Sequence, residues 1–411
     1  MRQRITLSII FSFLVLSLAF SQEPLKIYGY GSLYFEKASP WSNAPAGTKG
    51  DPGEFAFSHL NIMMQKNITD KIKFFVNLAA PDAQGVIVRN FWGEYAFSDM
   101  LKLRVGKIYR PFDQFNELLD AAPTYLGMEP PEIYDKDHLM LPRTGKIMLH
   151  GAMPIGSNFL KYSYMLDSDE QFKVSDGSKI TLSHGWDVKF SMLDDKLTIG
   201  HSGYLGNERN GTEIGLGQGS PNGGVLPWMA TDKYSVFGGY FNAKIGNISL
   251  MGGYTMSQHK AVRDTGAILT LFANTSLNAA QDKNFFGSTA GAATHTGADV
   301  VTSANYTVTA YYIRLGYTIT KDKVPFELGE ITPYVFFEGY SNPETIAEKT
   351  WGGDNEAGWA DDGVFYKPTV GLVFKPAYNM ALKLDFGPHI FKSGGQTVKY
   401  NEFRTELSFM F

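Results

Sequence analysis

The sequence predicts an all-β protein that forms one transmembrane antiparallel β-barrel of about 16 strands, and three observations support this prediction. The 411 residues include 22 Tyr and 30 Phe but only 19% charged residues, so apolar and polar side chains must be interleaved. Segments of period-two alternation recur along the chain. The connections between them alternate between short turns and long polar stretches, as in a barrel with one flat and one looped rim.

The N-terminal residues 1–21 are typical of a secretory signal peptide. Two arginines precede an apolar run from Ile5 to Phe20, and small residues stand at the positions that a signal peptidase recognises. A single membrane anchor is the competing interpretation, but the run is shorter than a spanning helix needs and no basic cluster follows it. We therefore predict that residues 22–411 form the barrel.

The strands are predicted from strict alternation. In the segment 101–106, three apolar residues alternate with Lys102, Arg104 and Gly106, and the segments 71–78 and 382–387 follow the same pattern. In a barrel the apolar face contacts lipid and the charged face lines the lumen. An even number of strands leaves both termini on one side. Sixteen segments begin near Lys26, Glu54, Lys71, Val86, Leu101, Gly145, Phe159, Leu182, Leu197, Tyr234, Ile248, Tyr306, Ile331, Gly363, Met380 and Tyr400.

The connections are sorted by parity. Short turns follow several even-numbered segments, such as Gly246–Asn247 after the tenth. A soluble sandwich has no reason to sort its loops in this way, so the alternation favours a barrel. Long polar or Gly-rich stretches follow most odd-numbered segments: 38–53, 110–144, 167–181, 206–233, 259–305 and 341–362.

The end of the chain and one internal segment carry a family resemblance. The last segment alternates apolar and polar residues up to an aromatic C-terminus, Phe411. In this respect the chain resembles the outer-membrane porins of Gram-negative bacteria. The segment Leu103–Phe112 (LRVGKIYRPF) is similar to the strand-to-loop segment of the phosphate-selective porin O and P type and of related general diffusion porins. The resemblance implies an outer-membrane location and a barrel that assembles as a homotrimer.

The loop 110–144 is the candidate pore constriction. The resemblance implies that the loop after the fifth strand folds into the lumen, and the residues agree. The loop carries ten apolar anchors that an outer loop would leave in water, and five stiffening prolines. An ordinary surface loop is the alternative. Its predicted constriction residues are the acids Asp113, Glu117, Asp120, Glu129, Glu132, Asp135 and Asp137.

The predicted lumen wall is net basic. Strand parity places more bases than acids on the inner face, opposite the acidic loop, and such an arrangement would set up a transverse field in the constriction. Each charge could instead be a solvated residue or part of a salt bridge. The predicted bases are Lys73, Lys102, Arg104, Lys383 and Arg404, with Lys146, Lys161, Lys189 and Arg314. The predicted acids are Glu94, Asp187, Asp385, Glu402 and Glu406.

The residues give little support to covalent chemistry or to nucleic-acid binding. The chain has no Cys, a net charge of −4, no His-x-x-x-His pair and no Gly-x-Ser-x-Gly motif. A cation site at 135–138 is possible in principle, but acid-rich loops are usually just solvated, so we predict no metal and no cofactor. A phosphate-binding loop at 215–219 is excluded by its glycine spacing.

The expected function is that of a water-filled channel for passive diffusion of small hydrophilic solutes and ions. The alternatives are a selective anion or phosphate channel, a barrel enzyme, and a surface protein that transports nothing. The expected partners are outer-membrane lipids, solutes and two further copies of the chain. Sequence support for the trimer is limited to an excess of apolar residues on the early strands, which a lipid-facing girdle would explain equally well: Ile72, Phe74, Phe91, Tyr95 and Phe97. The identity of the solute stays open.

Overall fold

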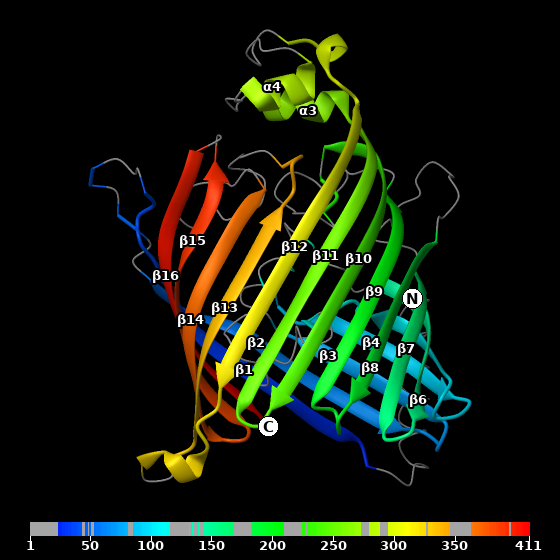
Figure 1. Ribbon diagram of the computed structural model, residues 1–411. Coiled ribbons are helices and arrows are strands. Elements are labelled where there is room, and N and C mark those ends of the chain that lie inside the picture. The colour runs from blue at the N-terminus through cyan, green and yellow to red at the C-terminus, as the bar shows by residue number, and fades with distance from the viewer. Residues whose placement is uncertain are drawn as a thin grey trace, which may run out of the picture.

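Sixteen antiparallel strands close into a single barrel in the computed structural model, which confirms the predicted fold class (Figure 1). Each strand pairs with its neighbours in sequence, and β1 pairs with β16. The signal peptide predicted for residues 1–21 lies outside the described residues. The structure describes residues 24–42, 46–47, 49–50, 53–80, 85–115, 131, 134, 139, 144–167, 182–208, 224–226, 228–272, 279–287, 295–325, 328–345, 363–393 and 396–411.

The strands vary in length around the barrel. The strands β3 to β5 have 8, 10 and 7 residues, whereas β10 and β11 have 17 and 16. In Figure 1, β12 rises toward α3, above the ends of β13 and β14. The strands are β1 Lys26–Ala38, β2 Glu54–Asn67, β3 Ile72–Ala79, β4 Ile87–Ala96, β5 Lys102–Ile108, β6 Thr144–Ile155, β7 Asn158–Asp167, β8 Ser183–Met192, β9 Leu197–Glu208, β10 Met229–Ile245, β11 Ile248–Arg263, β12 Ser303–Tyr317, β13 Glu330–Ser341, β14 Val364–Ala377, β15 Met380–Ser393 and β16 Gln396–Met410.

Alternation along each strand separates an outer from an inner face. In β12, Tyr312 and Arg314 are buried inside the barrel, while Ile313 and Leu315 are 47% and 44% exposed on the outside. Exposed apolar side chains of this kind would be costly in water but are suited to lipid. The polar side chains that alternate with these apolar ones therefore face the lumen.

Several strands begin earlier in the sequence than predicted. The strand β10 begins at Met229 rather than near Tyr234, and β16 begins at Gln396 rather than near Tyr400. Outward positions in these extensions, such as Thr231 and Lys233, are polar. An extension beyond the lipid belt has no apolar face, so alternation of hydrophobicity cannot reveal it.

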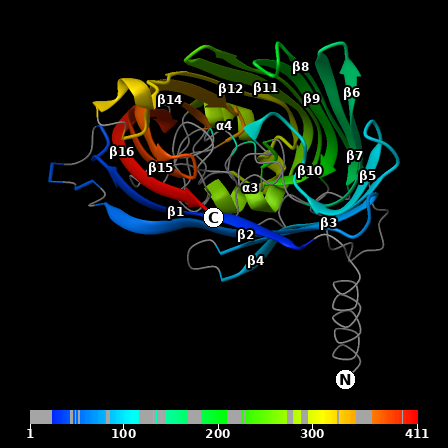
Figure 2. The same ribbon diagram turned by 90° about the horizontal axis from the view of Figure 1, so that it is seen from below.

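The predicted loop 259–305 is partly regular. Its first five residues belong to β11, and it contains the helices α3 Thr265–Phe272 and α4 Ala279–Phe286 and the 3-10 turn η5 Gly297–Asp299. The helices lie above the looped rim, and in the view along the barrel they lie across its opening (Figures 1 and 2). Arg263, at the end of β11, fixes this segment by a two-pronged ion pair with Glu344 at 2.9 and 2.8 Å.

The parity of the connections has two exceptions. Residues 318–329 form a long connection on the short-turn rim, with the 3-10 turn η6 Lys321–Lys323. On the looped rim, only two residues separate β15 from β16. No helix among the described residues is long and apolar enough to cross a membrane.

Candidate pore constriction

Arg110 fixes the point at which the chain leaves β5. Its side chain is fully buried, with Nη2 at 3.1 Å from Asp167 Oδ2 on β7 and the guanidinium 3.2 Å from the centre of the Tyr204 ring. Lys146 Nζ lies 3.6 Å from the same carboxylate. Because a buried charge without partners is costly, this cluster holds the start of the loop against the inner wall.

Asp113 then attaches the loop to the wall formed by β9 and β12. Its backbone adopts φ 56°, a left-handed conformation that Asp tolerates better than most residues. Its backbone N–H donates to Ser202 Oγ on β9 at 2.9 Å, and the Tyr312 hydroxyl on β12 donates to Oδ1 at 2.7 Å. Gln114 Nε2 donates to the carbonyl oxygen of Phe241 on β10 at 3.3 Å and to the Tyr312 hydroxyl at 2.9 Å. The chain after β5 therefore reaches β9, β10 and β12 through hydrogen bonds.

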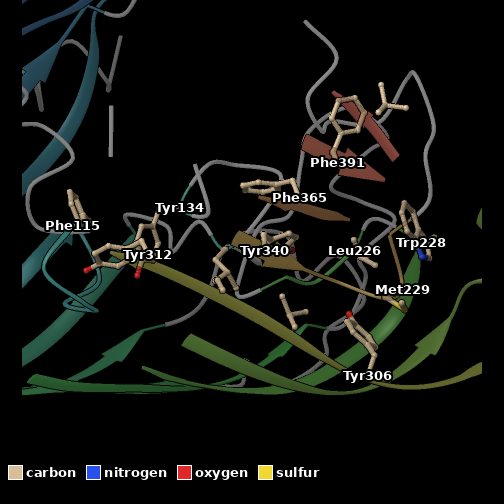
Figure 3. Packing of buried hydrophobic residues seen from close by; sticks show 14 of the residues in the cluster. Phe115, Tyr134, Leu226, Trp228, Met229, Tyr306, Tyr312, Tyr340, Phe365 and Phe391 are labelled. Atoms are coloured by element: carbon tan, nitrogen blue, oxygen red, sulfur yellow. The ribbon is translucent and has the colours of Figure 1, made fainter. Parts of the chain in front are cut away.

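Aromatic rings support the same attachment. Phe115 packs edge-on against Tyr312 with ring centres 5.1 Å apart, and Tyr134 lies 6.3 Å from Tyr312 (Figure 3). Four of the ten predicted apolar anchors are among the described residues, and all four are buried: Phe112, Phe115, Tyr134 and Leu139. A loop exposed to water would not bury these side chains.

Burial changes the acidity of Asp113. Loss of water around the carboxyl group raises its pKa from 3.8 to about 6, although hydrogen bonds from Tyr312 and from the backbone of Phe115 and Gln114 oppose the shift. The backbone N–H groups of Gln114 and Phe115 and the Tyr312 hydroxyl all donate to Oδ1, while Oδ2 is buried without a hydrogen-bond partner among the described residues. Asp113 therefore anchors the loop through a carboxyl group that is buried rather than exposed to the lumen.

The other predicted constriction acids lie outside the described residues. These are Glu117, Asp120, Glu129, Glu132, Asp135 and Asp137, together with the segment 135–138 weighed as a cation site. Among the residues that are described, no group of three or more His, Asp or Glu side chains is placed to hold a metal ion.

On the inner face of β4 to β6, the predicted wall base Arg104 forms an ion pair with Glu94. Its Nη2 lies 2.6 Å from Glu94 Oε2, and the guanidinium stacks 3.9 Å from the Trp92 ring centre. His150 Nε2 contacts the same Glu94 oxygen at 2.9 Å. Burial raises the cost of separating such a pair, so Arg104 is a structural part of the wall as well as a charge in it.

A second charged wall covers the inner face of β13 to β16 and β1. Glu402 lies 2.7 Å from Lys367 and 3.1 Å from Arg404, and Arg404 also reaches Glu36 at 3.4 Å. Lys383 pairs with Glu406 at 3.5 Å. The predicted list missed Glu36 and Lys367, although strand parity alone would have placed both on the inner face.

Three predicted wall bases have no ion pair within the described part of the chain. They are Lys73, Lys102 and Lys161, which lie near the short-turn ends of β3, β5 and β7. Of the others, Lys146 and Lys189 pair with Asp167 and Asp187. Arg314 is buried and lies 4.2 Å from the Phe336 ring centre. Excess positive charge among these wall bases is therefore concentrated toward the short-turn rim.

A buried hydrogen-bond chain on β10 and β11 was missed from the sequence. Ser257 Oγ lies 2.7 Å from His259 Nε2, and His259 Nδ1 lies 2.8 Å from Asp232 Oδ2. This order matches that of a hydrolase triad. However, all three residues are at most 2% exposed, and the His259 ring is stacked 4.2 Å from Tyr306. A substrate cannot reach Ser257 in this arrangement, so packing is the role that the geometry supports.

Several solved structures of outer-membrane proteins have a similar fold. The outer-membrane channel DcaP of Acinetobacter baumannii has a TM-score of 0.54 at 8% identity, covering 95% of this chain and 99% of that one. A loop L8 deletion mutant of OmpT, an outer membrane protein of Vibrio cholerae, has a TM-score of 0.51 at 11% sequence identity. The match covers 94% of this chain and 99% of that one. OmpF of Salmonella typhi, in complex with daunomycin, has a TM-score of 0.50 at 13% sequence identity. The match covers 94% of this chain and 97% of that one.

These likenesses confirm the predicted fold and the resemblance to Gram-negative outer-membrane porins, whose barrel this chain shares over nearly its whole length. No family model and no curated protein matches the sequence.

Proposed function

We propose that this protein is an outer-membrane porin, a water-filled channel for passive diffusion of small hydrophilic solutes and ions. The observation that carries the proposal is the attachment of the loop after β5 to the inner faces of β9 and β12, through Asp113. A closed barrel with inward charged residues provides a polar path across the apolar outer band. The loop 110–144 narrows that path. No covalent chemistry is part of the proposal.

The charge arrangement favours a general pore over a strongly selective one. Most wall bases have an acidic partner within 4 Å, so their field is largely local. Lys73, Lys102 and Lys161, which have no ion pair among the described residues, attract anions to the short-turn mouth only. The expected selectivity for anions is therefore weak, and the acids Glu117, Asp120, Glu129 and Asp135 of the loop would reduce it further.

Maturation and assembly complete the proposal. The signal peptide 1–21 directs the chain out of the cytoplasm, and the barrel inserts in the outer membrane with its short turns in the periplasm and its long loops outside. Three copies associate through the outer face of β3 to β5. Support comes from the exposure of Phe91 at 51% and Ile72 at 39%, and from the shortness of these three strands.

A liposome-swelling assay tests the channel directly. Vesicles that contain the purified protein should swell in isosmotic solutions of small sugars, at rates that fall as the sugar grows from a pentose to a trisaccharide. Vesicles without protein, and vesicles with heat-unfolded protein, are the controls. Swelling no faster than in these controls would show that the barrel conducts no solute.

A further inference from the structure

Two lysines stand side by side on the outer face of the barrel. Lys233 on β10 is directly opposite Lys260 on β11. Asn207 on β9 and Asn305 on β12 continue the row on either side. Both lysines are exposed, whereas the neighbouring Tyr234 and His259 are 2% exposed and face inward. The row therefore points away from the lumen, toward the surroundings of the barrel.

No acidic partner of the lysine pair is found among the described residues. Like charges directly opposite each other on adjacent strands repel, so such a pair costs stability unless an anion lies between them. The described outward positions of β9 to β12 include no acidic residue. The nearest candidate in the adjoining mouth loop, Glu344, is committed to Arg263 at 2.8 Å. The local charge thus fits a negatively charged ligand from outside the chain.

The lysines line a groove with suitable hydrogen-bond groups. The groove has a volume of about 1180 Å³, and its lining includes hydroxyl and amide side chains next to the two ammonium groups. Phosphate oxygens accept several charge-assisted hydrogen bonds at once, which suits this set. The lining side chains that concern the argument are Lys233, Ser235, Gln258, Lys260, Asn305 and Thr307.

The height of Lys233 and Lys260 above the apolar belt indicates that the anion comes from a lipid headgroup. Outward residues are apolar as far up as Phe237 and Met256, and Tyr254 and Tyr311 lie just below. The four residue-to-residue steps from Met256 to Lys260 span about 14 Å along a strand, or roughly 10 Å along the membrane normal at the usual tilt. Lysine stems are long enough to bring the charge down to lipid headgroups.

We propose that the extracellular end of the outer face of β9 to β12 binds the phosphate-bearing headgroup of an outer-leaflet lipid. Lys233 and Lys260 hold one phosphate between them, and the amide and hydroxyl groups contact the attached sugar. The site rests on the proposed outer-membrane location but not on conduction, so each proposal can fail without the other.

The test measures retention of bisphosphorylated lipid A by the purified full-length protein in neutral detergent. The double variant Lys233→Gln/Lys260→Gln should bind it at least about tenfold more weakly than the unchanged protein. The matched control, Lys37→Gln/Lys399→Gln, removes two exposed outward lysines from the same ends of β1 and β16 and should change binding less than about twofold. Unboiled gels establish that each variant is folded, and liposome swelling reports conduction separately.

Three outcomes would overturn the proposal. Equal losses in the two double variants would show that net charge alone attracts the lipid. Equal retention of dephosphorylated lipid A would show that its acyl chains, rather than its phosphate, are recognised. Displacement of lipid A by millimolar inorganic phosphate would make this a site for the free ion. Loss of swelling with lipid binding intact would instead count against the channel alone.

Discussion

At the scale of single residues, Asp113 predicts a pH dependence. Its pKa of about 6 in the folded protein is above the value of about 3.9 for an unfolded chain. The folded state therefore holds the proton more tightly, so the contribution of Asp113 to the free energy of unfolding rises as pH falls from 7 to 4. The difference is at most about 3 kcal/mol.

The variant Asp113→Asn isolates this contribution, because an amide oxygen can still accept the hydrogen bond from Tyr312. It should be more resistant to urea than the unchanged protein at pH 7.5, and the difference should shrink as pH is lowered through 6. Urea unfolding in detergent at a series of pH values measures it. Parallel curves for the two proteins would mean that Asp113 stays charged in the folded state.

A substitution at Gly253 tests the attachment of Asp113, because an added side chain would clash with Asp113 and Tyr312. A Cβ at this position on β11 would lie 2.7 Å from Asp113 Oδ2 and 2.6 Å from the Tyr312 ring, closer than packed atoms can approach. Gly253→Ala should therefore weaken the attachment, and amide hydrogen exchange of residues 110–115 should be faster. Gly239→Ala is the control, since nothing but a backbone oxygen at 4.0 Å is near its Cβ. Unchanged exchange in Gly253→Ala would argue against the anchor.

At the scale of elements, the assignment of strand faces predicts the outcome of two substitutions in β5. Leu103 faces lipid, where Arg costs about 2 to 4 kcal/mol near the midplane, so Leu103→Arg should lower the folding yield in lipid. Lys102 faces the lumen without an ion pair among the described residues, so Lys102→Leu should fold normally. Equal yields of the two variants would contradict the faces.

Arg104→Leu is the less suitable control, although the sequence pattern alone makes it equivalent to Lys102→Leu. Both residues face inward, but Arg104 holds Glu94, whose side chain is only 5% exposed. Removal of Arg104 leaves that carboxylate with His150 alone, and a half-paired buried charge is costly. Alternation predicts which face a side chain occupies but not which partner it finds across the strand.

The strands were predictable because lipid imposes a simple rule. Every outward position in the belt must be apolar, and Ile313 and Leu315 show this on β12. The rule stops where lipid stops, which is why the start of β10 was predicted late. The contact of Asp113 with Ser202 and Tyr312 joins residues 89 and 199 positions apart, and no local pattern encodes such a pairing. The family resemblance and the apolar anchors of the loop predicted that it folds inward, but neither predicted which wall residues it contacts.

At the scale of the whole molecule, the outer face of β3 to β5 predicts a trimer. Phe74 and Phe91 pack edge-on with ring centres 5.2 Å apart, and Tyr95 and Phe97 do so at 4.9 Å, leaving an aromatic outer surface. An oligomer band that disappears on boiling is expected on gels. Phe91→Arg should reduce this band more than Val370→Arg on β14, which is also exposed to lipid. Monomers alone after mild extraction would contradict the prediction.

The central claim is a water-filled barrel narrowed by the loop 110–144, and single-channel conductance in a planar bilayer tests it most directly. Deletion of residues 117–137, which leaves Arg110 and Asp113 in place, should increase the conductance because the narrowest section widens. Neutralising Glu117 and Asp120 should shift the reversal potential toward anions, whereas neutralising Asp354 and Glu356 should not, because salt screens outer loops. Unchanged conductance on deletion, or equal shifts for the two acid pairs, would contradict the account.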